Sequence, residues 1–211
     1  MKKLTMLFLL IAGCIQANAQ QPYCCTTQGK VLTYTQYNAK GKETGTTTQQ
    51  TYKEVSGSDG NYDITIESKV KIGKRETVTE TTMIVREGSV QMSMGGADVE
   101  VTVSNPKLLD IPVELEVGQQ LPLGDMEMKA GPLKVTSTIT ENEVIESEEL
   151  TTPAGTFECF VVKQASTGRV MGTKTETVTK TWYARGIGSV KTETYTNGKL
   201  MNTTLLTEMS E

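Results

Sequence analysis

The residue types that most often carry out catalysis are missing from this chain. Its 211 residues include no histidine, which removes the commonest general base, the Ser-His-Asp triad and most zinc sites. Neither a GxSxG nucleophile pattern nor a phosphate-binding P-loop occurs. The sequence therefore predicts a protein that is not an enzyme, with no cofactor and no bound metal.

Carboxylates are the remaining groups with catalytic potential. Three glutamates lie within residues 146–149, where alternation with other polar residues is typical of a solvated strand face. Asp59–Asp63 begins like a calcium-binding loop, but the sixth and twelfth positions of that loop are Ile64 and Val70 instead of glycine and a carboxylate. A carboxylate-only glycosidase would need two acids converging in a cleft, and no specific pattern supports one.

Three cysteines follow the N-terminal apolar segment: Cys24, Cys25 and Cys159. The first two lack the spacing of a CxxC redox pair. Neighbouring cysteines rarely bond to each other without strain, so the bridge to consider joins Cys24 or Cys25 to Cys159. Such a bridge would close a very long loop, for which chain-entropy models give about 4 kcal/mol. The alternative is three reduced thiols, with Cys159 simply buried.

Methionine and aromatic residues form the other unusual set. Four of the ten methionines occur as two pairs spaced two residues apart, so each pair projects from one face of a strand. Flexible thioethers suit an adaptable apolar pocket, although core packing in a chain with few aromatic residues explains them equally. The candidate ligand-binding residues are Met92, Met94, Met126, Met128, Tyr34, Tyr37 and Trp182.

Strand patterns dominate the chain, because threonine and valine alternate with other residues and clusters of Gly, Asn and Asp interrupt them. Ile64, Ile66 and Val70 share one face of such a strand, as in a sheet with one dry and one wet face. Asn197-Gly198 is the strongest hairpin signal. Strands are predicted at Val31–Tyr37, Thr46–Val55, Tyr62–Val70, Thr77–Arg86, Ser89–Met94, Val99–Val103, Met126–Lys129, Leu133–Thr140, Asn142–Thr151, Phe157–Ser166, Thr173–Ala184, Ser189–Thr196 and Leu200–Glu208.

These strands predict an all-β fold. Residues 107–125 contain prolines and predict an extended crossing loop with a short turn or helix. The many consecutive hairpins favour one strongly curved antiparallel meander that forms an open half-barrel, and the alternative is a two-sheet β-sandwich. An open roll leaves an apolar concave surface, which is the physical reason to expect a ligand there.

The N-terminus predicts export. Two lysines precede an apolar run over residues 4–15, and Ala17-Asn18-Ala19 supplies the small residues of a signal peptidase site. We therefore expect a signal peptide over residues 1–19 and a single β-domain over residues 20–211. The apolar run is shorter than the roughly 20 residues that cross a bilayer, so no transmembrane segment is predicted.

A second interpretation of the N-terminus is a lipid anchor. Ile11-Ala12-Gly13-Cys14 resembles a lipobox, in which the cysteine is lipidated and tethers the domain to a membrane. Secretion without an anchor is the favoured of the two, because the apolar segment before Cys14 would be short and isoleucine is less usual than leucine at that position.

The charge balance excludes one class of partner. The net charge of the chain is −4, and removing Lys2 and Lys3 with the signal peptide lowers it to −6. Nucleic acid binding needs basic patches, so no nucleic acid partner is predicted. The same balance disfavours attachment to anionic lipid.

Three patches resemble one known family. They are Gly29–Gly45, Thr151–Phe160 and Trp182–Lys191, and together they are similar to the exported TapB-like domains of Bacteroides-type bacteria, relatives of a periplasmic domain of unknown function. The resemblance implies an envelope protein with a curved sheet like that of lipoprotein carriers, and it implies no catalytic residues. The adjacent Cys24 and Cys25 depart from the family pattern.

Two functions follow from these observations. The leading one is a non-enzymatic envelope protein that holds a lipid or another apolar ligand in the concavity of its sheet. The alternative is a structural or protein-interaction module of a cell-surface complex, with a closed core and an exposed apolar patch or free sheet edge.

Overall fold

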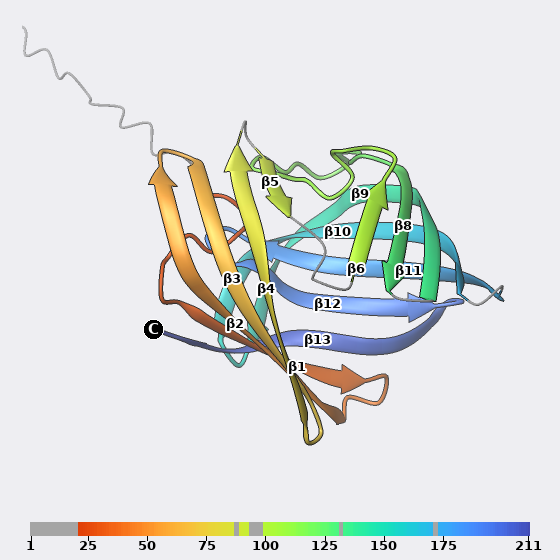
Figure 1. Ribbon diagram of the computed structural model, residues 1–211, viewed down its shortest axis with the longest axis horizontal. Helices are drawn as coiled ribbons and strands as arrows, with labels where there is room; N and C mark the ends of the chain where they lie inside the picture. Colours follow the sequence, from red (N-terminus) through yellow and green to blue (C-terminus); the bar gives the residue numbers. More distant parts are fainter. Residues whose placement is uncertain (1–20, 87–88, 93–98, 131–132, 171–172) are drawn as a thin grey trace, which may run out of the picture.

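In this computed structural model, one antiparallel sheet contains every strand of the described residues (Figure 1). The structure describes residues 21–86, 89–92, 99–130, 133–170 and 173–211. Their thirteen strands are β1 (Val31–Asn38), β2 (Glu43–Ser58), β3 (Asn61–Ile72), β4 (Arg75–Arg86), β5 (Ser89–Met92), β6 (Val99–Val103), β7 (Ile111–Pro112), β8 (Gly124–Ala130), β9 (Leu133–Thr152), β10 (Gly155–Val170), β11 (Thr173–Ala184), β12 (Gly188–Thr196) and β13 (Lys199–Ser210).

The order of the strands makes the sheet an open roll. It runs β6-β8-β9-β10-β11-β12-β13-β1-β2-β3-β4-β5-β7, so β1 joins the first half of the chain to its last strand while β6 and β7 form two separate edges. In Figure 1, β2–β4 run steeply and β10–β13 run across them, which shows how strongly the sheet turns. The predicted curved antiparallel half-barrel is confirmed. The sandwich alternative is wrong, because all strands belong to one hydrogen-bonded sheet.

Tight turns set the hairpins where the sequence predicts them. Asn197 and Gly198 have φ values of 49° and 75° between β12 and β13. Asp59 and Gly60, with φ values of 52° and 82°, make the equivalent turn between β2 and β3. Positive φ at both central residues matches the right-handed twist of paired strands, so the local sequence selects these two-residue connections.

Three predicted elements, two strands and the crossing loop, differ in detail from the structure. Leu133–Thr140 and Asn142–Thr151 are parts of one strand, β9, because the pairing with β10 skips Thr140 and continues beyond it. A bulged residue interrupts the alternation of side chains without ending the strand, which is why the pattern indicated a break. The predicted crossing loop has turns at residues 106–109 and 117–118, as one of its two alternatives predicts, and it also contains the short strand β7, which pairs with β5.

The main core joins the two halves of the roll. Buried side chains of β1–β5 pack with buried side chains of β10–β13 in one cluster, which the N-terminal segment completes. Its fully buried members include Leu32, Ile64, Val161, Val190 and Leu206. Because these residues lie far apart in the sequence, the core depends on the curvature of the whole sheet.

A second cluster covers the other face of β9 and β10. Val162 follows Val161 directly, so it points to the opposite face, where it packs with Tyr23, Leu115, Leu121 and Val144. Backbone hydrogen bonds hold the crossing segment against β9: the amides of Gly118 and Leu121 donate to the carbonyls of Val144 and Asn142 at 2.7 and 2.8 Å. This part of the sheet is therefore covered on both faces.

The predicted disulfide is not present. Cys24, Cys25 and Cys159 are free thiols, and all three are buried in the main core. Burial raises the pKa of Cys24 to about 12 and that of Cys159 to about 11. The side chains therefore act as small apolar core residues, in agreement with the alternative of three reduced thiols and a buried Cys159.

The predicted signal peptide, its cleavage site and the lipobox cysteine Cys14 lie outside the described residues. Within the described ranges, no helix is long and apolar enough to span a membrane.

Truncating the centre of the core should destabilise the fold. Leu206 is 0% exposed, so Leu206→Ala removes buried methyl groups at the junction of the two halves and should lower the free energy of unfolding by about 2–5 kcal/mol. Leu123 is 49% exposed, and Leu123→Ala should change it by about 0.5 kcal/mol or less. Chemical denaturation measures both values, and equal losses would contradict this core.

Candidate functional site

The concavity of the roll contains a cavity of about 340 Å³. Its walls come from β1–β5 and β7 on one side, and from β11–β13 and the N-terminal segment on the other. None of the described residues that line it carries a charge. The cavity is therefore a neutral space between the two halves of one sheet.

Part of one wall of the cavity is apolar, while Thr48, Gln50, Thr81 and Thr82 of β2 and β4 add polar groups to the same wall. Ile66 of β3, Met83 of β4, Val90 of β5 and Ile111 of β7 line the apolar part. Val90 pairs directly with Ile111 in the sheet, which places the two side chains on one face. The alternation of apolar and polar residues in β3 and β4 turns this face inward.

The opposite wall carries hydroxyl groups. Thr181 pairs with Thr192, and Thr192 pairs with Thr204, so these threonines of β11, β12 and β13 form a row across one face of the sheet. All three line the cavity. Among the hydrogen bonds of the described residues, none uses their hydroxyls, which leaves them available to a ligand. We call Thr181, Thr192 and Thr204 the threonine row.

Tyrosines complete the lining. The Tyr34 hydroxyl donates a hydrogen bond to the carbonyl oxygen of Ser189 at 3.0 Å, which ties β1 to β12 across the strand between them. The Tyr183 hydroxyl makes no hydrogen bond within the part of the chain that the structure describes. Burial raises the pKa of Tyr183 to about 12, and it raises the pKa of Tyr34 and of Tyr52 as well. These phenols are neutral at physiological pH, so they add polarity without charge.

Arg185 fixes the two segments that close the cavity. Its Nη1 donates hydrogen bonds to the carbonyl oxygens of Gln21 at 3.0 Å and Val113 at 2.9 Å. Its Nη2 lies 3.2 Å from Oε2 of Glu114, and its guanidinium lies 4.7 Å from the centre of the Tyr23 ring. The N-terminal segment and the crossing segment supply cavity residues, so this arginine positions part of the lining.

The predicted aromatic residues do not gather at one place. Tyr34 lines the cavity, but Tyr37 does not. Trp182 is buried in the main core, on the face of β11 opposite to Tyr183. Its Nε1 donates a hydrogen bond to Glu148, and the Lys191 ammonium lies 4.1 Å from its ring centre.

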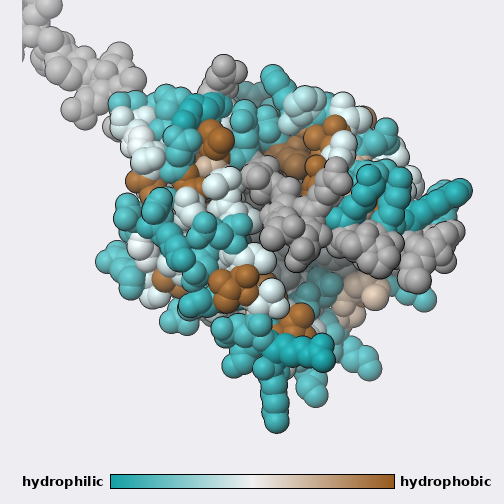
Figure 2. All heavy atoms as spheres, in the orientation of Figure 1, coloured by the Kyte–Doolittle hydropathy of each residue, from teal (hydrophilic) through white to brown (hydrophobic). Residues whose placement is uncertain are grey.

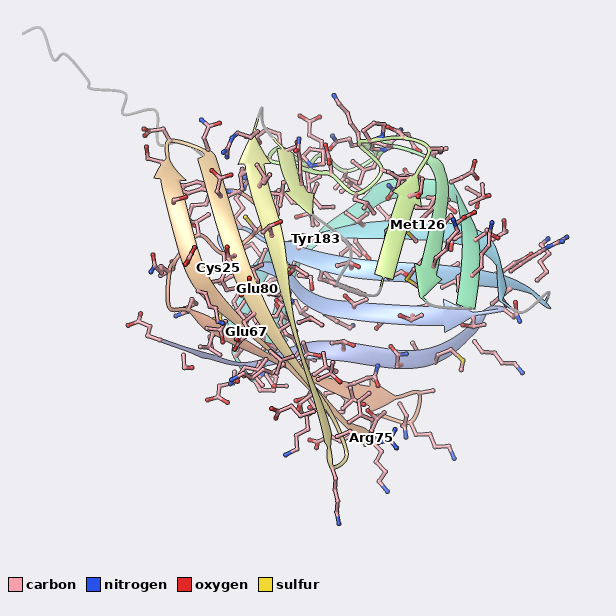
Figure 3. The ribbon with its side chains drawn as sticks, viewed as in Figure 1. Cys25, Glu67, Arg75, Glu80, Met126 and Tyr183 are labelled. Carbon is pink, nitrogen blue, oxygen red and sulfur yellow. The ribbon has the colours of Figure 1, made fainter. Side chains whose placement is uncertain are left out.

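Of the predicted methionines, Met126 and Met128 have described side chains, and neither lines the cavity. Met126 borders a separate polar hollow of about 590 Å³ between β6 and β8–β11, and Met128 lines neither space. Figure 3 shows Met126 toward the β6–β8 end and Tyr183 nearer the centre of the molecule. Met92 belongs to β5 by its backbone, but its side chain and Met94 lie outside what the structure describes.

The acids remain outside the cavity. Glu146, Glu148 and Glu149 are exposed on β9, as the sequence predicts. Glu148 accepts a hydrogen bond from Nε1 of Trp182, and Glu149 lies directly opposite Glu158 of β10. Within the described ranges, no group of three potential metal-binding side chains comes together.

Comparison with known proteins identifies the family. The sequence profile of the DUF3108-like family matches residues 27–206. The chain belongs to the DUF3108-like family. A search of curated proteins found no match.

Two solved structures resemble this DUF3108-like protein. One is a predicted exported protein with a YmcC-like fold from Bacteroides fragilis, with a TM-score of 0.76 and 19% identity over 90% of this chain and 100% of that chain. The other is a predicted lipoprotein from Parabacteroides distasonis, with a TM-score of 0.74 and 19% identity over 90% of this chain and 99% of that chain. At this identity the likeness shows that the fold is shared.

Alkaline pH should destabilise the protein through the buried tyrosines. Below about pH 10 the folded and unfolded chains both keep their phenolic protons. Above it the unfolded chain loses the proton of Tyr183 while the folded chain keeps it up to about pH 12, so stability should fall by about 1.4 kcal/mol per pH unit for that group. Denaturant titrations between these pH values should show a shallower fall for Tyr183→Phe. An identical slope in the variant would contradict the burial of this phenol.

Proposed function

We propose that this DUF3108-like protein is a non-enzymatic protein of the cell envelope that binds an uncharged amphipathic ligand, of lipid type, in the cavity of its sheet. The main support is the lining: an apolar patch of β3–β5 and β7 faces a row of hydroxyl groups without bonding partners, and none of the described lining residues is charged.

The lining selects the chemistry of the ligand. Moving an ionised group into such a space costs several kcal/mol unless an opposite charge meets it, and the lining offers none. The apolar part of the ligand would contact Ile66, Met83 and Val90, and its hydroxyl or ester groups would bond to the threonine row. A volume of about 340 Å³ lies near the lower end of the usual range of ligand sites, roughly 300–1,000 Å³, so the cavity suits one acyl chain or a small amphiphile.

Export is part of the proposal. The sequence supports a signal peptide over residues 1–19 followed by one β-domain over residues 20–211. The two similar structures, described as an exported protein and a lipoprotein, agree with an envelope location. Two narrower proposals are compatible with the same location. One is membership of the TapB-like domains, and the other is a lipid anchor on Cys14.

A second candidate function is a protein-interaction module. The outermost strands β6 and β7 each have one edge that no other described strand pairs with. A partner could add a strand to such an edge. Binding of a protein together with an empty cavity would favour this function over ligand binding.

Filling the cavity should abolish binding of a neutral apolar probe. Thr204 lines the cavity, and its neighbour Thr203 does not. Thr204→Phe places an aromatic ring in the space and should weaken binding of N-phenyl-1-naphthylamine by about tenfold or more, which corresponds to about 1.4 kcal/mol. Fluorescence titration measures the affinity, and Thr203→Phe is the matched control.

Two outcomes would overturn the proposal. One is a wild-type protein that does not bind the neutral probe at all. The other is an equal loss of affinity in Thr203→Phe and Thr204→Phe, because that would place the probe outside the cavity.

A further inference from the structure

A three-stranded arm projects from the body of the sheet. It consists of the start of β2, the end of β3 and the start of β4, and the turn at residues 73–74 forms its tip. All residues from 71 to 80 are exposed, so both faces of the arm contact solvent. Figure 1 shows this hairpin extending beyond the other strands at the lower end of the molecule.

The tip collects cations that have no ionic partner. Lys71, Lys74 and Arg75 lie at the β3–β4 turn, while Lys40 and Lys42 lie at the β1–β2 turn. Within the described residues, no ion pair engages any of these five side chains. Figure 3 shows Arg75 at the lower end, with several nitrogen-tipped side chains extending around it.

The two turns form one surface, and the net charge of that surface is opposite in sign to the net charge of the whole chain. The amide of Gly73 donates to the carbonyl of Gly45 at 3.1 Å, which joins the β3–β4 turn to the start of β2. Only Glu43 and Glu76 accompany the five cations, so this tip has a net charge of +3 in a chain whose net charge is −4. The rest of the molecule is correspondingly acidic.

A large apolar side chain lies among these cations. Ile72 is 61% exposed at the tip, and Val78 of the same arm is 52% exposed. In Figure 2 hydrophilic side chains dominate the lower end of the molecule, with hydrophobic patches just above it. Exposed apolar residues flanked by lysine and arginine are the combination by which interfacial segments hold to membranes.

We propose that this tip, with the cations Lys40, Lys42, Lys71, Lys74 and Arg75 around Ile72, docks on an anionic lipid surface. The tip is convex, so it offers no groove for a peptide, but it can place Ile72 at the headgroup level while the flexible lysines reach the phosphates. The acidic remainder would be repelled by the same surface, which would orient the molecule with the arm toward the membrane. The overall charge disfavours attachment to anionic lipid, whereas the local distribution favours it at this one end.

Vesicle binding by the mature protein, purified after export, tests the proposal. The probe is phosphatidylcholine vesicles with and without phosphatidylglycerol, in low and high salt. The protein should sediment only with the anionic vesicles, and added salt should weaken the binding. The double variant Lys74→Glu/Arg75→Glu should lower the affinity about 30-fold or more, since each cation near such a surface contributes about fivefold.

Two further variants separate the contributions of charge and apolar contact. Ile72→Ser should lower the affinity about tenfold and leave the salt dependence in place. Lys174→Glu/Lys199→Glu changes the net charge by the same amount away from the tip, and it should retain most of the binding. Thermal melting of each variant checks that the fold is intact.

Three results would overturn the proposal: no preference of the wild-type protein for anionic vesicles, equal losses in the two double variants, or binding of the tip to an acidic protein but not to vesicles. Because none of the tip residues lines the cavity, each of these results leaves the cavity proposal standing.

Discussion

An open antiparallel sheet with one apolar face can bury that face only by curving until its own halves meet. In this protein the main core consists of that contact, between side chains of β1–β5 and side chains of β10–β13. Because the hydrophobic effect is roughly proportional to the apolar area removed from water, the curvature and the core stabilise each other. The crossing segment and the N-terminal segment then complete the closure, and the Arg185 hydrogen bonds hold them at the β11–β12 turn.

The cavity is a direct consequence of this construction. Where the two halves touch, residues such as Leu206 and Val190 are fully buried, and where they diverge, the inner face lines a space instead of a core. The ion pairs of the described residues involve side chains outside this lining. The two proposed functions therefore use different parts of the molecule. The uncharged concavity suits a neutral amphiphile, and the basic tip suits an anionic surface.

The sequence predicts the strands and hairpins well because these depend on local alternation and on turn residues. It predicts register poorly. The two-residue turn at Asn197-Gly198 alone would place Thr192 opposite Thr203, but a bulge beside Tyr195 shifts the pairing to Thr204. The threonine row depends on that shift, so no pattern in the sequence identifies it.

The candidate site residues show the same limit. Tyr34 was identified from its type and lines the cavity, whereas Trp182 and Tyr183 are neighbours that point to opposite faces of β11. Which face is inward depends on how the whole sheet curves, and alternation within one strand does not reveal it. Arg185 was visible in a distinctive patch, but its hydrogen bonds reach segments far away in the sequence.

The central claim is that this curved sheet encloses a site for an uncharged amphipathic ligand. Native mass spectrometry of the protein purified from its own envelope tests this claim most directly. We expect a population heavier than the mature chain by the mass of one lipid-like molecule, released as a neutral apolar compound on denaturation. A bare chain that also remains bare after incubation with neutral lipids would contradict it.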